Sequence, residues 1–168
     1  MAFKNILDMH VHTDNSFDGN HSAMFMCEAA EKAGLRSVTF TDHCEVDFYK
    51  ERHFDQSDFH SFFEVSKAKS AFMGKLLVNA GIELGQPTYD KETAEYIISR
   101  FAYDQVIGSI HNLRDMPDFC ELKYDDYDIY KILDEYFEEE LELAKWGKFD
   151  TLAHLTYPLR YMVGDQGY

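Results

Sequence analysis

Two histidines near the start of the chain have a spacing that suits metal chemistry. His10 and His12 end an apolar run that we predict to be a strand over residues 3–12. Because side chains alternate across a strand, both imidazoles and the carboxylate of Asp8 are expected on one face. Two imidazoles about one pleat apart can hold a single metal ion. Asp8 could then accept a proton from the far nitrogen of a ligand imidazole and fix its tautomer.

Further candidate ligands stand where later strands end. Apolar alternation predicts four more strands, over residues 37–41, 76–83, 105–111 and 150–154. They end at or beside His43, Glu83, His111 and His154. The carboxyl ends of parallel strands meet at one edge, where active sites of α/β barrels lie. These side chains are therefore predicted to form one metal site, whereas His21, His53 and His60 are interpreted as surface residues.

The intervening segments have the pattern of helices that cover such a sheet. Helices are predicted over residues 21–33, 57–73, 90–99 and 126–146. Gly34 and Gly147 suit helix ends, and Ser57 and Asp90 suit helix starts. Strands alternating with helices imply an α/β fold with a parallel sheet. The long connection over residues 44–56 is predicted to be a lid.

Composition limits the classes of function. The 168 residues suit a single domain over 1–168, and a formal net charge of -15 disfavours nucleic acid as a partner. The acidic run over residues 125–142 is interpreted as a solvated helix face. No apolar stretch suits a membrane span or a secretory signal. The three cysteines form no disulfide framework, so a cytoplasmic location is expected.

Five short motifs together resemble those of the PHP (polymerase and histidinol phosphatase) superfamily. They are Asp8-Met9-His10-Val11-His12-Thr13, Thr41-Asp42-His43, Gly81-Ile82-Glu83, Gly108-Ser109-Ile110-His111 and Leu152-Ala153-His154-Leu155. The resemblance implies a distorted (β/α)7 TIM-like barrel, of which this chain holds about the first five β/α units. It also implies two to three divalent metals (zinc, manganese or iron) at the carboxyl face of the barrel.

The resemblance also assigns roles to single residues. By it, His10 and His12 hold the first metal, Glu83 bridges to the second, and His111 and His154 complete the second. His43 and Asp18 would hold the third metal. Asp42 and Arg160 are the catalytic candidates, with Arg160 gripping a phosphate through its planar guanidinium. A late Asp-x-His motif of the family has no counterpart here. We therefore expect either a C-terminally truncated piece, which we favour, or an open barrel with a depleted site. The unpaired last strand would favour a homodimer.

The segment from Phe149 to Tyr161 is similar to the histidinol-phosphatase branch of the superfamily. The expected activity is hydrolysis of histidinol phosphate, a step of histidine biosynthesis, through attack by a metal-bound hydroxide. The partner would be a small phosphorylated substrate, and Glu45 and Asp47 of the predicted lid are candidate partners for its ammonium. Two alternatives stay open: a phosphoesterase for another substrate, such as a nucleotide or phosphotyrosine, and a non-catalytic metal-binding domain. A nuclease of the same superfamily is a third, which is disfavoured because it should need a basic, aromatic groove and this chain lacks a basic run.

Overall fold

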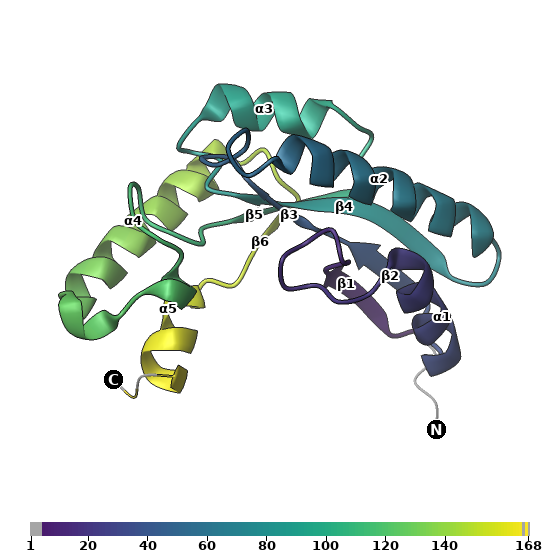
Figure 1. Ribbon diagram of the computed structural model, residues 1–168, viewed down its shortest axis with the longest axis horizontal. Helices are drawn as coiled ribbons and strands as arrows, with labels where there is room; N and C mark the ends of the chain where they lie inside the picture. Colours follow the sequence, from purple (N-terminus) through teal and green to yellow (C-terminus); the bar gives the residue numbers. More distant parts are fainter. Residues whose placement is uncertain (1–4, 166, 168) are drawn as a thin grey trace.

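A computed structural model describes residues 5–165 and 167 and shows a parallel sheet curled into a half-barrel (Figure 1). Its strands are β1 (Leu7–Val11), β2 (Ser37–Phe40), β3 (His43–Glu45), β4 (Leu77–Gly85), β5 (Gln105–Ser109) and β6 (Thr151–Leu152). The strand order is β1-β2-β4-β5-β6, and β3 pairs with β4 beyond the end of β2. The predicted α/β class and partial barrel are confirmed, although residues 3 and 4 of the predicted first strand lie outside the described residues.

Helices connect the strands and lie along the outside of the sheet. They are α1 (Ala23–Ala33), α2 (Phe54–Ala71), α3 (Lys91–Ser99), α4 (Ile129–Trp146) and the short α5 (Tyr157–Leu159). Two single turns cover Phe119–Glu121 and Tyr124–Asp126, and a π-helical segment covers Arg160–Asp165. Figure 1 shows α1, α2 and α3 along the convex side of the sheet. Among the described residues, no helix is long and apolar enough to cross a membrane.

Local side-chain chemistry sets most of the helix ends. The Ser22 hydroxyl and the Asp90 carboxylate accept backbone amides at the starts of α1 and α3. Gly34 and Gly147 end α1 and α4 in the left-handed conformation, as predicted. The predicted start of α2 at Ser57 is wrong, because a run of turns after residue 46 winds into the helix at Phe54.

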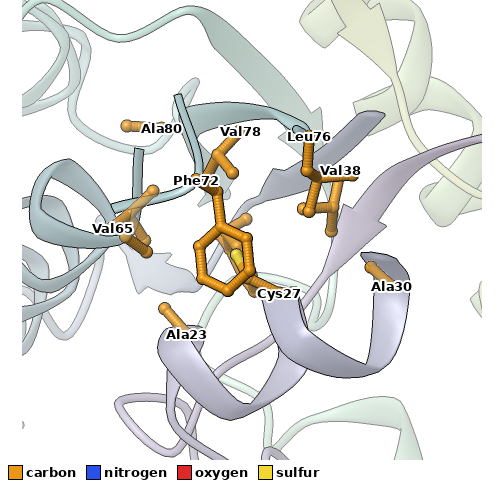
Figure 2. Packing of buried hydrophobic residues seen from close by; sticks show 11 residues of the cluster. Ala23, Cys27, Ala30, Val38, Val65, Phe72, Leu76, Val78 and Ala80 are labelled. Atoms are coloured by element: carbon orange, nitrogen blue, oxygen red, sulfur yellow. The ribbon is translucent and has the colours of Figure 1, made fainter. Parts of the chain in front are cut away.

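The convex side of the sheet holds an apolar core (Figure 2). Ala23 and Cys27 of α1 pack with Val65 of α2 and Phe72 against Val78 of β4. A second buried cluster lies where α4 covers β5, and a third lies around α3. The concave side is polar at its base, where the Asn79 amide donates to the hydroxyls of Ser37 and Thr39. Packing on the convex side thus fixes the strands whose carboxyl ends carry the predicted ligands.

Within the described residues, β1 and β6 each pair with one neighbouring strand. The outer edges of the half-barrel are therefore open. An open edge exposes backbone donors and acceptors that a further strand could pair with. The homodimer expected from such an edge stays a prediction.

Candidate metal centre

The predicted ligands meet in one cleft of about 390 Å³ at the carboxyl ends of the strands. The cleft is lined by all seven of them: His10, His12, Asp18, His43, Glu83, His111 and His154. His10 lies on β1, His43 on β3 and Glu83 on β4. His111 and His154 follow β5 and β6 by two residues each, because both strands end earlier than predicted. The sheet thus brings together side chains that are up to 144 positions apart in the chain.

Glu83 occupies the centre of this cluster and is only 1% exposed. One of its carboxylate oxygens, Oε1, lies 3.0 Å from His154 Nε2, 3.2 Å from His111 Nε2 and 3.6 Å from His10 Nε2. The other, Oε2, lies 3.1 Å from His12 Nε2 and 3.2 Å from His43 Nδ1. A single buried carboxylate therefore faces five imidazoles.

The electrostatics of the cluster are those of a site that holds positive charge. Burial opposes the charged form of Glu83, but the neighbouring imidazoles hold its pKa well below the usual range. Burial likewise opposes a charge on His43, yet hydrogen bonds to Asp18 and Glu45 raise the pKa of His43 to about 10. The pKa of His111 is also raised well above its ordinary value against the effect of burial, by Glu45 and Glu83. The carboxylates thus stabilise positive charge on the imidazoles beside them.

The ligand atoms fall into small groups with the geometry of metal sites. Among the described residues four groups have ligand atoms within 4.8 Å of one another; one is His43, Glu45 and His111, and the other three match the three expected metals. They are His10, His12 and Glu83; Glu83, His111 and His154; and His12, Asp18 and His43. The donors are imidazole nitrogens and carboxylate oxygens, which suit zinc, manganese and iron.

The contacts of His12 test whether a cation fits. Its Nδ1 lies 2.9 Å from Asp18 Oδ1, so a proton on Nδ1 leaves the Nε2 lone pair facing Glu83 Oε2 at 3.1 Å. Both facing atoms are buried, and neither has a hydrogen-bond partner among the described residues. Two acceptors this close need a positive charge between them: either a second proton on His12, whose pKa the Glu83 carboxylate raises against the effect of burial, or a divalent metal, which these nitrogen and oxygen donors fit.

Asp18 is held in the site by a tight loop between β1 and α1. Its Oδ2 lies 3.7 Å from His43 Nε2, in addition to its contact with His12. The loop passes so close to itself that a β-carbon on Gly19 would lie 1.8 Å from the Thr13 carbonyl oxygen. Glycine is therefore needed beside Asp18, and the carboxylate is directed into the cleft.

Asp42 does not line the cleft but lies behind it, at 4% exposure. Its carboxylate accepts from the Thr13 amide at 2.6 Å, the Thr13 hydroxyl at 2.7 Å, the Ser16 hydroxyl at 2.8 Å and the Ser61 hydroxyl at 2.5 Å. Ser16 Oγ in turn accepts from the backbone amide of His43 at 3.0 Å. This geometry favours an anchoring role for Asp42 over the catalytic role predicted.

Asp8 also differs from its prediction. Its Oδ1 lies 3.5 Å from the backbone nitrogen of His10, while the ring nitrogen Nδ1 of His10 lies 2.6 Å from Thr41 Oγ1. Thr41 thus takes the place at the imidazole that we had predicted for Asp8. The reason is a register shift between Asp8 and Val11, which breaks the strict alternation of β1.

The rim of the cleft carries Arg160 and several aromatic residues. Arg160 is exposed at the start of the π-helical segment, with its guanidinium carbon 5.6 Å from the Tyr161 ring centroid. The Tyr157 ring centroid lies 4.7 Å from that of His154. Phe17 stacks on His43 at 4.9 Å between ring centroids and is 73% exposed. Sequence analysis missed Phe17 and Tyr157, because single aromatic residues in connecting segments follow no periodic pattern.

The position of Glu45 also differs from its prediction. It belongs to β3 instead of a lid loop, since β4 extends two residues past Glu83 and pairs with it there. The Glu45 carboxylate is buried against His43 and His111. Asp47 lies outside the metal cleft, where it accepts from the Asn112 amide. The three surface histidines are exposed as predicted, and all three cysteines are free.

Comparison with known proteins agrees with this geometry. Residues 8–167 match the PHP domain. The chain belongs to the PHP domain family. Among curated proteins it is 26% identical to a probable histidinol-phosphatase of Deinococcus radiodurans, over 93% of this chain and 62% of that protein. It is 28% identical to the histidinol-phosphatase of Lactococcus lactis, over 92% of this chain and 58% of that protein. This PHP chain thus spans about three fifths of the length of the relatives it matches.

Solved structures share the fold. The crystal structure of the Lactococcus lactis histidinol phosphate phosphatase, complexed with zinc, L-histidinol and phosphate, superposes with a TM-score of 0.75 at 22% identity. The match covers 92% of this PHP chain and 59% of that chain. The putative histidinol phosphatase of Listeria monocytogenes gives a TM-score of 0.63 at 17% identity, covering 94% and 69% of the two chains. The half-barrel therefore has the fold of a part of the Lactococcus lactis chain.

Proposed function

We propose that this chain is a metal-dependent phosphoesterase domain that hydrolyses histidinol phosphate to histidinol and phosphate. The observation that carries the proposal is the convergence of five imidazoles, Glu83 and Asp18 in one cleft, with Arg160 at its rim. The names of the curated relatives support the substrate. Because this PHP chain spans only part of those relatives, the activity of the whole protein is part of the proposal.

Two to three divalent ions would be held by the three ligand groups described above. Imidazole and carboxylate donors fit zinc, manganese or iron, and the Lactococcus structure contains zinc. When bound, such ions neutralise phosphoryl oxygens and lower the pKa of water to near neutrality. In this assignment Glu83 belongs to two of the groups, and its burial keeps it from exchanging partners with solvent.

The chain's own residues would bind and orient the substrate. Arg160 presents a planar guanidinium that can donate two parallel hydrogen bonds to a phosphate. Phe17 and Tyr157 offer flat apolar surfaces on either side of the imidazole cluster for the organic part of the substrate. A cleft of about 390 Å³ suits a small molecule. The net charge of -15 disfavours nucleic acid, and free cysteines suit a reducing compartment such as the cytoplasm.

The test is metal content per chain together with phosphate release from histidinol phosphate on the same purified sample. Two or three metals with turnover are the expected result. A panel of nucleotides, phosphotyrosine and sugar phosphates should be hydrolysed more slowly, and a faster panel member would redirect the substrate assignment. Two metals without turnover of any phosphoester would support the alternative, a non-catalytic metal-binding domain.

A further inference from the structure

We propose that Glu45 is a positioning residue that couples two of the metal groups, since one of its carboxylate oxygens orients the imidazoles of both His43 and His111. This inference rests on the metal centre of the proposed function and concerns the fourth group, His43, Glu45 and His111, in which we assign Glu45 to hydrogen bonding instead of metal binding. The support comes from the contacts of Glu45, from the two residues that hold it, and from the strand pairing that places it.

The contacts of Glu45 are unusually symmetric. Its Oε1 lies 3.0 Å from His43 Nδ1 and 3.0 Å from His111 Nδ1. His43 belongs to the group with His12 and Asp18, whereas His111 belongs to the group with Glu83 and His154. Glu45 itself is 7% exposed. One buried oxygen therefore touches a ligand of each of two metal positions.

The consequence for the imidazoles is a fixed tautomer. In the metal-bound protein each ligand imidazole is neutral, and because a carboxylate accepts hydrogen bonds, the one proton of each ring lies on the Nδ1 that faces Glu45. The Nε2 of His111 is then unprotonated toward Glu83 and His154, at 3.2 and 3.3 Å. The Nε2 of His43 is likewise unprotonated toward Asp18, at 3.7 Å. Carboxylates that orient ligand imidazoles in this way raise metal affinity.

Two neighbours hold the Glu45 carboxylate in place. Gln86 is fully buried, and its side-chain amide meets complementary partners when its nitrogen is assigned to the side of Glu45: it then donates to Glu45 Oε2 at 2.5 Å and accepts from the backbone amides of His111 and Asn112, each at 3.0 Å. Its backbone takes a left-handed φ of 50°, which a non-glycine residue adopts at a cost. Gly85 leaves the space that the carboxylate occupies, because a β-carbon there would lie 1.8 Å from Glu45 Oε2.

Strand pairing fixes the depth of Glu45. β3 pairs with the last part of β4 so that His43 is opposite Glu83 and Glu45 is opposite Gly85. Two residues further along a strand a side chain returns to the same face. Glu45 therefore stands directly behind His43, as Gly85 stands behind Glu83.

The test measures zinc affinity of the whole chain by competition with a chromophoric chelator, without substrate. Glu45→Gln keeps the shape of the side chain and removes its charge. Loss of an orienting partner lowers metal affinity about 10- to 100-fold. We expect that loss for two of the bound ions, with the ion at His10, His12 and Glu83 changed less than about threefold. Nitrogen NMR shifts should also show a mixed tautomer for His43 and His111 in the variant.

A second variant guards against misfolding of the first. Gly85→Ala should displace Glu45 and reproduce the loss at the same two ions, whereas Gly164→Ala, which meets no atom within 4 Å, should not. Asp58→Asn is the matched buried-carboxylate control, since Asp58 bonds Arg100 and Tyr103 and no imidazole. It should lower stability and leave zinc affinity unchanged.

The outcomes separate this inference from the proposed function. Wild-type zinc affinity and unchanged tautomers in Glu45→Gln would overturn the role of Glu45 whether or not the chain hydrolyses a phosphoester. A loss confined to one ion would overturn the coupling. Zinc binding that responds to Glu45 in a chain without phosphatase activity would instead refute the proposed function and keep the inference. A wild-type chain that binds no zinc would overturn both.

Discussion

Replacing Asp42 with alanine should unfold the loop that carries Asp18 before it affects any chemical step. The Asp42 carboxylate accepts four hydrogen bonds, one from a backbone amide and three from hydroxyls. A buried donor left without its acceptor costs about 1–3 kcal/mol. The Thr13 amide cannot turn to a new partner, whereas the hydroxyls of Thr13, Ser16 and Ser61 can rotate. If the unpaired amide costs near the upper end of this range and each hydroxyl costs near or below the lower end, the free energy of unfolding falls by about 4–6 kcal/mol.

That loss is a large part of the about 5–15 kcal/mol by which domains are stable. Asp42→Asn is the matched variant, because it keeps one oxygen in place and its amide can donate to a rotated hydroxyl. For it we expect a loss of about 1–2 kcal/mol in the free energy of unfolding. Urea unfolding of both variants, with metal content measured on each, is the assay. Metals held by Asp18 and His43 should be lost in proportion to the loss of stability.

The opposite pattern would refute this reasoning about Asp42. If Asp42→Ala unfolded within about 1 kcal/mol of the wild type and kept its full metal content, yet lost turnover, then the carboxylate would act on the substrate. The catalytic role predicted from the sequence would then stand, and the anchoring role inferred from its burial would fall.

Two further predictions concern the rim and the charge of the cleft. Arg160→Ala should raise the inhibition constant of inorganic phosphate about 10- to 100-fold with metal content unchanged, because one charged hydrogen-bonding group is lost. Arg160→Lys should restore part of the affinity for phosphate. An unchanged inhibition constant would show that Arg160 does not bind the phosphate. Carboxylate partners raise the pKa of His43 to about 10 and the pKa of His111 well above its ordinary value. Both imidazoles therefore carry a second proton, and a positive charge, in the metal-free protein at pH 7.5. Metal binding should therefore release protons and become stronger as pH rises. Calorimetry in buffers of different ionisation enthalpy measures the number of protons released. Metal binding without proton release would contradict the placement of these two imidazoles beside carboxylates.

The sequence by itself determined where the ligands stand on their strands. Apolar alternation located the strand ends at His12, Glu83 and His111 to within a few residues, and capping residues located most helix boundaries. These features depend on neighbours a few positions away, because strand faces and helix caps are local properties of the chain. The motif order then indicated the PHP family, which the match over residues 8–167 confirms.

Only the tertiary structure decided which side chains stand behind those ligands. Glu45 contacts the imidazoles of His43 and His111 because β3 pairs with a part of β4 that lies 40 residues away in the chain. Asp42 lies behind the cleft instead of lining it, because donors from Thr13 and Ser61 surround its carboxylate. Thr41, not Asp8, contacts the His10 imidazole, because β1 shifts register against β2. Each outcome depends on long-range pairing and burial, which no local pattern encodes. The candidate ligands could thus be predicted from the sequence, whereas the residues proposed to orient them required the fold.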